Sequence, residues 1–407
     1  MTAMYSFTEQ FAAPQGSPIR ELFKYLAQPG MISFAGGYPA PSLFDSQGLA
    51  RSAAAAMREY PAACLQYGAT EGDASLNQAL LMLMQERGIA AQAEQLLITT
   101  GSQQAFELLL RVLVTPGDCV AIERPAYPAA IQALRIAAAN ICALSSDAGG
   151  LDVDAFEQQL EQGLRPRLLY LVPTFANPSG ATLTLARRKK LLALAIRYRM
   201  LVVEDDPYGE LRFSGAPLPT LYQLAQEIPG AAEWLIYLSS LSKIVAPGLR
   251  IGWLLAPAEI RRRAVIAKQT SDLCTAPWMQ LTAAHYLSSG QLAPHMAKLI
   301  AAYRLRCDTM LTALRQQFGA ALEVVEPEGG MFIWARWHNR SDATQLLQTA
   351  IAENVLYVPG SAFFADRPDP ASLRLSFAMA EPEAIADGVK RLKTAYERFM
   401  SSSEKNR

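Results

Sequence analysis

The residue that carries the most chemical information is Lys243, in the segment 239–253. It follows an apolar run, 234–239, that is typical of a buried strand. An amine among small hydroxyl residues at a strand end lies where open α/β sheets bind ligands, and it can lose its proton and attack a carbonyl to form a Schiff base. Arg250, seven residues later, offers paired donors suited to a phosphate. The alternative is a surface loop with two solvated cations. The spacing, with Pro247-Gly248 between the two, favours a ligand site.

Two other expected strand ends carry groups that suit a phosphorylated ring. The segment 100–104 joins a strand to a helix, and its glycine, hydroxyl and helix N-terminal N–H groups would form an anion cup. Gly-Ser at a helix start is also an ordinary N-cap, so this signal is weak alone. Tyr127 follows the next strand and would stack on a flat ring, with a core or rim tyrosine as the alternative.

The segment 173–180 follows a further expected strand and contains an amide side chain, that of Asn177. Asn177 would donate to a phenolic oxygen, although an amide before Pro-Ser-Gly usually indicates only a turn. Asn177-Pro178 is also a candidate cis peptide bond, because X-Pro bonds in turns hold most cis bonds.

Two carboxylates, Asp205 and Asp206, end another strand and precede Tyr208. Such a pair could bind a metal or act as a general acid and base. The sequence offers neither a histidine cluster nor the further oxygens that a hard metal needs, so no metal site is predicted. One buried carboxylate facing a pyridine nitrogen is the alternative that Lys243 favours.

The elements that must position these residues alternate along the chain. Near-continuously apolar runs, typical of strands buried on both faces of a parallel sheet, occupy 96–100, 119–123, 167–172, 200–204, 234–239 and 251–256. Helix-like segments lie between them at 103–114, 152–162, 185–198 and 259–270. The alternation predicts an α/β fold whose large domain has three layers around a mostly parallel sheet.

The two ends of the chain differ from this pattern. Residues 1–50 are rich in glycine and proline and are expected to form an arm, while the last third reads as a long helix from Pro294, short strands and a closing helix from Pro382. We expect a smaller α+β domain built from the arm and the C-terminal third. The predicted division is 1–50 for the N-terminal arm and part of the small domain, 51–290 for the large cofactor-binding domain, and 291–407 for the small domain.

Composition excludes several classes of protein. The 407 residues include 37 Lys+Arg and 37 Asp+Glu, and zero net charge argues against binding nucleic acid or an anionic membrane. The five cysteines are scattered and the three histidines lie far apart, so neither a disulfide framework nor a local metal motif is indicated. No targeting or membrane-spanning segment is evident, which predicts a soluble cytoplasmic protein. The basic run 187–190 is expected to be a solvated helix face.

Taken together, these segments resemble the fold-type I pyridoxal-5′-phosphate (PLP) aminotransferases of class I/II, in particular the branch of α-aminoadipate, kynurenine and aromatic aminotransferases. That branch includes the aminotransferase-like half of some transcriptional regulators. The segments that carry the resemblance follow the family's order, at 32–44, 65–72, 99–107, 123–128, 173–180, 204–208, 240–253 and 372–377.

The resemblance implies PLP as cofactor and assigns roles around its ring. Lys243 would hold PLP as an internal aldimine, and Asp205 would keep the ring nitrogen protonated. Tyr208 and Asn177 would bond the ring hydroxyl, and Tyr127 would stack over the ring. Asp205 is chosen because the family pattern is Asp-x-x-Tyr; with another register Asp206 would inherit the role.

Further residues would hold the phosphate and the substrate. Those expected at the phosphate are Ser102, Gln103, Ser240, Arg250 and, reaching in from a neighbouring subunit of a homodimer, Tyr67. Those expected at the substrate are Arg374 and Asn177 for the α-carboxylate, Gly37 for its backbone at the mouth, and Arg20. Arg20 would contact an acidic group at the far end of the substrate. The alternative is that Arg20 is an ordinary arginine on the surface of a helix.

The implied activity is the transfer of an amino group from an L-amino acid of the aminoadipate, aromatic or branched-chain type to a 2-oxo acid, by a ping-pong mechanism through the Lys243 aldimine. A PLP-dependent lyase or decarboxylase of the same fold is the main alternative. A PLP-binding sensor of a transcriptional regulator would need a DNA-binding module ahead of residue 32, where about 30 residues are too few. A nucleotide-binding enzyme lacks both of its glycine-rich phosphate motifs.

Overall fold

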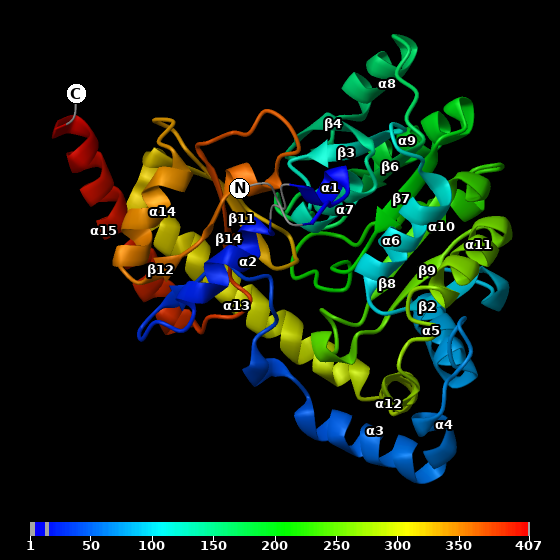
Figure 1. Cartoon of the computed structure of the whole chain (residues 1–407). Helices are drawn as coiled ribbons and strands as arrows, with labels where there is room; N and C mark the ends of the chain where they lie inside the picture. The colour runs from blue at the N-terminus through cyan, green and yellow to red at the C-terminus, as the bar shows by residue number, and fades with distance from the viewer. Residues whose placement is uncertain (1–4, 13–15, 406–407) are drawn as a thin grey trace.

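A sheet of eight strands forms the centre of the computed structural model, which describes residues 5–12 and 16–405 (Figure 1). From one edge to the other the strands are β2 (Leu96–Thr99), β9 (Gly252–Leu255), β8 (Leu235–Ser240), β7 (Leu201–Asp205), β6 (Leu168–Leu171), β3 (Cys119–Arg124), β4 (Asn140–Asp147) and β5 (Gly150–Leu151). Strands β8, β7, β6, β3 and β4 are parallel neighbours, whereas β9 is antiparallel to β8 and β2, and β5 to β4.

The apolar runs become strands because both faces of the sheet are covered. All residues of β6 and β8 are buried, so the side chains that alternate between the two faces need cover on each. Helix α6 (Ser102–Leu113) packs on β8 and β9, α10 (Leu221–Glu227) packs on β8, α11 (Ala258–Gln269) packs on α6, and α9 (Leu185–Tyr198) packs on α10 and on α8 (Val153–Glu161). The parallel strands end at one edge, where the candidate residues gather.

A second, antiparallel sheet lies apart from the first, with the order β10 (Leu322–Val325), β11 (Phe332–Trp337), β14 (Ser372–Ser376) and β13 (Val358–Pro359). The long helix α13 (Leu292–Phe318) and α14 (Ala343–Ala352) both pack on α15 (Pro382–Lys405) beside it. In Figure 1 this part, coloured from yellow in α13 through orange to red in α15, lies to one side of the large sheet.

The N-terminal arm joins this smaller unit. Strand β1 (Ile32–Ser33) pairs in parallel with β12 (Val355–Leu356), so the arm completes the C-terminal third. The predicted α/β fold, with a large, mostly parallel sheet and a smaller α+β unit, is confirmed. The division of the chain at residues 50 and 290 stays a prediction.

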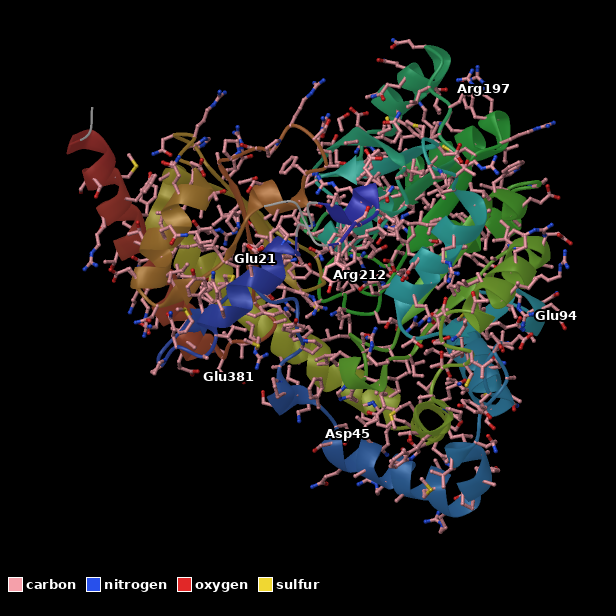
Figure 2. The ribbon with its side chains drawn as sticks, in the orientation of Figure 1. Glu21, Asp45, Glu94, Arg197, Arg212 and Glu381 are labelled. Atoms are coloured by element: carbon pink, nitrogen blue, oxygen red, sulfur yellow. The ribbon has the colours of Figure 1, made fainter. Side chains whose placement is uncertain are left out.

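Contacts also link the two parts directly. Arg212 lies between them in Figure 2, while Glu94 and Arg197 lie at the periphery. The guanidinium of Arg212 pairs with Glu328 and lies 4.7 Å from the ring centre of Phe175, and the backbone of Arg212 forms a β-bridge with Gly329. This arginine therefore ties the loop after β7 to the loop before β11.

Several elements differ from the sequence-based expectation. Strand β4 was not predicted, because its sequence NICALSSD mixes polar residues into a partly exposed strand near the sheet edge. The first helical layer, α3 (Ser46–Glu59), α4 (Pro61–Leu65) and α5 (Ala74–Glu86), was not predicted either, nor were α7 (Pro128–Ile136) and α12 (Pro277–Ser288). No helix within residues 5–12 and 16–405 is long and apolar enough to cross a membrane.

The prediction that the run 187–190 is a solvated face is wrong for Arg188. Its side chain is fully buried and lies 3.8 Å from the carboxylate of Glu204. It donates to the backbone oxygen of Pro173 at 2.9 Å and to the Thr174 hydroxyl at 2.8 Å. A charge pattern cannot reveal this, because the partners lie on another strand and loop. Arg188 thus anchors the loop that carries Asn177.

Candidate active site

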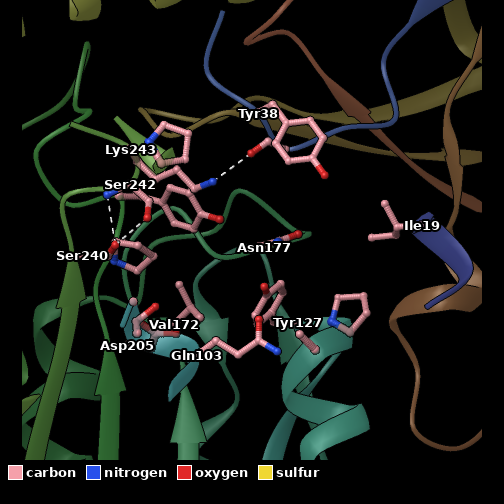
Figure 3. A pocket seen from close by; sticks show the side chains of 18 of the residues that line it. Ile19, Tyr38, Gln103, Tyr127, Val172, Asn177, Asp205, Ser240, Ser242 and Lys243 are labelled. Carbon is pink, nitrogen blue, oxygen red and sulfur yellow. Dashed lines mark hydrogen bonds between the residues drawn. The ribbon is translucent and has the colours of Figure 1, made fainter. Parts of the chain in front are cut away.

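One cavity of about 300 Å³ lies at the carboxyl ends of β3, β6, β7 and β8 (Figure 3). Every predicted site residue except Tyr67 lines it: Arg20, Gly37, Ser102, Gln103, Tyr127, Asn177, Asp205, Tyr208, Ser240, Lys243, Arg250 and Arg374. The parallel strands explain the convergence of those residues that follow strands of the large sheet, since such residues meet at the same edge. Arg374 reaches the cavity from β14 of the small sheet, and Arg20 and Gly37 reach it from the N-terminal arm.

Strand β9 runs antiparallel to β8, so the chain reverses between them and places Lys243 and Arg250 at the same edge of the sheet. Ser240 on β8 pairs with Gly252 on β9, so the residues between them form a loop above the strand end. The Lys243 amine donates to the backbone oxygen of Gly37 at 2.9 Å (Figure 3). Burial, reinforced by the positive charges of Arg374 and Arg250, lowers the pKa of Lys243 to about 8. A sizeable neutral fraction near neutral pH makes this amine a competent nucleophile and base.

An anion cup is formed by the start of α6 and Arg250. Gly101 precedes the helix with φ of 86°, and Arg250 Nη2 donates to the backbone oxygen of Thr100 at 3.0 Å. The first N–H groups of a helix have no partners within it, and the helix dipole favours an anion there. Ser102 and Gln103 line the cavity at this point. The Ser240 hydroxyl nearby lies within hydrogen-bond distance of the Ser242 hydroxyl, at 2.8 Å, and of the backbone oxygen of Ile251, at 3.1 Å.

The cup has no room for a side chain at Gly101. A Cβ there would lie 2.6 Å from Arg250 Nη2. We expect Gly101→Ala to weaken PLP binding about tenfold or more, because it displaces a charge-assisted donor. A spectroscopic titration of the apoenzyme with PLP measures this.

Gly117→Ala is the matched control, since Gly117 has nearly the same φ, 89°, and a Cβ added there would meet no atom within 4 Å. Equal losses of PLP affinity in the two variants would show that backbone strain, not the contact with Arg250, governs the effect.

Asp205 ends β7 with one oxygen occupied and one free. The Tyr170 hydroxyl donates to Oδ2 at 2.6 Å, whereas Oδ1 is buried and has no hydrogen-bond partner in the part of the chain that the structure describes. Burial raises the pKa of Asp205 to about 7; the Tyr170 hydroxyl opposes this shift and the charge of Asp206 adds to it. Asp206 does not line the cavity, because its carboxylate accepts from Gly209 N–H and from the Tyr237 hydroxyl.

Arg374 is a buried cation on β14 whose fork is only partly used. Nη1 donates to Asn177 Oδ1 at 2.7 Å and Nη2 to the backbone oxygen of Ala35 at 2.6 Å, while Nε is buried without a partner among the described residues. The rings of Phe332 and Phe363 lie 4.2 and 4.8 Å from the guanidinium carbon. Burial lowers its pKa to about 10, so it remains charged near neutral pH. A planar cation in this state suits a carboxylate ligand.

Two tyrosines complete the cavity wall. Tyr208 is buried, its ring lies nearly perpendicular to that of Phe332 at a centroid distance of 5.9 Å, and burial raises the pKa of its hydroxyl. Burial likewise raises the pKa of Tyr127, with a contribution from the charge of Asp205. The Asn177-Pro178 bond is cis, as predicted.

Two predicted residues lie at or beyond the margin. Arg20 is exposed on the short helix α2 (Pro18–Glu21) and reaches the cavity mouth. Tyr67 is 77% exposed and lies outside the cavity of its own chain. Its role at a neighbouring subunit's site stays a prediction.

Some lining residues escaped the sequence analysis. Tyr38 belongs to the first segment of the family resemblance, but nothing there singled out the ring, and Gln132 and Phe332 lie on a helix and a strand without any local signal. Tyr170, which contacts Asp205 from outside the cavity, belongs in the sequence to the apolar run 167–172. A polar hydroxyl at the centre of that strand was the available clue.

These residues fit PLP. The Lys243 amine suits its aldehyde, the unpartnered Oδ1 of Asp205 suits a protonated ring nitrogen, and the start of α6 with Arg250 suits its phosphate. The unpartnered Nε of Arg374 suits the carboxylate of an amino acid.

Comparisons with known proteins point the same way. The family profile described as aminotransferase class I and II matches residues 41–392. The aromatic-amino-acid aminotransferase 1 of Thermococcus litoralis is 40% identical over 95% of this chain and 93% of its own length. The 2-aminoadipate transaminase of Thermus thermophilus is 40% identical over 93% of each chain. The crystal structure of the α-aminoadipate aminotransferase of Thermus thermophilus, complexed with N-(5′-phosphopyridoxyl)-L-leucine, superposes with a TM-score of 0.89 at 38% identity, covering 97% of this chain and 98% of the other.

Proposed function

This chain belongs to the class I and II aminotransferases, and on that premise we propose that it moves the amino group of an L-amino acid of the aminoadipate, aromatic or branched-chain type to a 2-oxo acid. It is an enzyme whose cofactor is pyridoxal 5′-phosphate. The observation that carries the proposal is the convergence on one cavity of the Lys243 amine, the unpartnered Oδ1 of Asp205 and the unpartnered Nε of Arg374.

When bound, PLP supplies an aldehyde that condenses with amines and a ring that withdraws electrons from the α-carbon. In the proposed mechanism Lys243 would hold the cofactor covalently. Asp205 Oδ1 would accept from the protonated ring nitrogen, and Ser102, Gln103, Ser240 and Arg250 would hold the phosphate. Tyr208 and Asn177 would bond the ring hydroxyl, and Tyr127 would stack over the ring.

The substrate is oriented by charge. Arg374 binds the α-carboxylate with the fork that Asn177 and Phe332 already keep in place. Lys243 Nζ would take the proton from the α-carbon. The lowered pKa of Lys243 supports this role, because a general base works best when its pKa lies near the working pH. Gly37 and Arg20 border the mouth, where the side chain of the substrate would enter.

Further parts of the proposal come from the sequence. The two half-reactions would alternate in a ping-pong order at this single site. A homodimer, in which Tyr67 reaches the neighbouring subunit's phosphate cup, is supported by the high exposure of that tyrosine. A cytoplasmic location also stays a prediction.

The reaction class is tested by its need for an acceptor. We expect the holoenzyme, given a panel of aminoadipate, aromatic and branched-chain amino acids, to release oxo acid continuously only when a 2-oxo acid such as 2-oxoglutarate is present. Without an acceptor, the amount of oxo acid should equal the amount of enzyme, because each cofactor accepts one amino group. Quantifying the oxo acid by chromatography measures this.

Continuous product formation without an acceptor would support the lyase or decarboxylase alternative. No feature of the cavity specifically favours that alternative or the sensor.

A further inference from the structure

A tyrosine hydroxyl supports Asp205 from behind. Tyr170 lies on β6, next to β7 in the sheet, and its side chain is 2% exposed. Its O–H donates to Asp205 Oδ2 at 2.6 Å, and its ring packs against Phe106 with a centroid distance of 4.4 Å. The rigid strand and this ring contact fix where the hydroxyl can lie.

We propose that Tyr170 is a positioning residue that favours the ionised form of Asp205 and holds its Oδ1 toward the ring nitrogen of the cofactor. The inference rests on the proposed function and deepens it, because it assigns a role to a residue outside the predicted site. Tyr170 does not line the cavity and acts only through Asp205.

The need for such a donor follows from burial. A carboxylate that leaves water loses its hydration and favours the neutral, protonated form. A protonated Asp205 would carry no negative charge to balance the positive charge of a protonated ring nitrogen. Asp206, the next residue after β7, adds a second negative charge that also disfavours ionisation.

The other groups that face Asp205 do not compensate. Tyr127, which follows β3, and Tyr208, in the loop after β7, have uncharged hydroxyls whose pKa values are raised. Among the described residues, Tyr170 is the one group whose contact lowers the pKa of Asp205.

The bond also sets the orientation of the carboxylate. With Oδ2 held by the hydroxyl, a rotation that would turn Oδ1 away must break a short hydrogen bond to a charged group. Oδ1 remains without a partner in residues 5–12 and 16–405, which is costly unless a ligand satisfies it. One oxygen is thus held by the protein while the other is kept for the cofactor.

The neighbouring strand offers a matched control. On β8, the fully buried Tyr237 donates its hydroxyl to Asp206 Oδ2 at 3.1 Å. This pair has the same chemistry, but Asp206 lines a different cavity together with Arg87 and Glu210. Removing the Tyr237 hydroxyl therefore tests the loss of a tyrosine–carboxylate bond without touching the cofactor side.

The test compares PLP binding by the apo forms of the wild type, Tyr170→Phe and Tyr237→Phe across a range of pH, followed by the absorbance of the bound cofactor. Tyr170→Phe should weaken binding about tenfold near neutral pH, the cost of losing a hydrogen bond to a charged group. Because the raised pKa of Asp205 rises further, the pH below which affinity falls should move upward. Tyr237→Phe should follow the wild type.

Several outcomes overturn the inference. If the acid limb of the binding curve lies at the same pH in Tyr170→Phe and the wild type, or moves equally in Tyr237→Phe, Tyr170 has only a structural role. In that case acceptor-dependent release of oxo acid by the wild type still upholds the proposed function. A wild type that binds no PLP overturns both.

A double-mutant cycle with Asp205→Asn keeps the test independent of stability. Once the carboxylate is replaced by an amide, removing the Tyr170 hydroxyl should have little further effect on PLP affinity. An equal loss of affinity in both backgrounds contradicts the inference. Thermal unfolding of each apo form shows whether the variants are folded.

Discussion

Replacing Lys243 by alanine is expected to abolish covalent attachment of PLP and to lower the rate of amino transfer by about a thousandfold or more, the range of a lost general base. The reason is that the proposed mechanism uses the same amine as anchor and as base. Its contact with Gly37 O and its lowered pKa mark it as the lysine of this cavity. The absorbance of the bound cofactor and the formation of oxo acid are the two measurements.

Lys243→Arg sharpens this result, because it keeps a positive charge but supplies no neutral amine near neutral pH. It should be as inactive as the alanine variant. Lys298→Ala is the control, since Lys298 is exposed and lies outside this cavity. Cofactor absorbance that is unchanged in both Lys243 variants would refute the assignment.

Arg374→Lys is expected to lower kcat/KM for the amino donor about a hundredfold, with most of the change in KM, because an ammonium cannot replace the planar fork that binds a carboxylate. The variant also lacks the contacts that the Arg374 guanidinium makes with Asn177 and the Phe332 ring. Initial rates at varied donor concentration measure the effect. PLP affinity should change little, since Arg374 is assigned to the substrate.

Arg336→Lys provides the comparison in the same small sheet. Arg336 lies on β11, is partly exposed and pairs with Asp369 at 2.7 Å, away from the cavity. Its variant should keep the kcat/KM of the wild type. If Arg374→Lys raised the dissociation constant for PLP as much as KM, Arg374 would be a cofactor ligand instead.

The sequence predicted best those residues that immediately follow a buried strand. Lys243, Asn177 and Asp205 meet in one cavity because parallel strands end at the same edge, and strands of this kind are visible as apolar runs. Their assigned roles stay predictions. The choice of Asp205 over Asp206 agrees with the side of the strand that faces the cavity, which the sequence spacing indicated only through Tyr208.

Residues that act across the sheet or from another part of the chain were beyond sequence reasoning. Tyr170 contacts Asp205 because β6 and β7 are neighbours, and the buried Arg188 finds its partners in Glu204 and in the loop at Pro173 and Thr174. Phe332 reaches the cavity from the second sheet. Such contacts depend on tertiary packing, which local periodicity does not encode.

The pairing of β1 with β12 has a consequence for folding during translation. The strand partner of Ile32 is Val355, which is synthesised near the end of the chain, so this pair cannot form earlier. The backbone oxygens of Ala35 and Gly37, which hold Arg374 and Lys243, follow directly after β1. A chain emerging from the ribosome can therefore build the large sheet first, since N-terminal units fold ahead of later ones during translation. Its catalytic cavity closes only when the last third has been made, so an unfinished chain carries no working site.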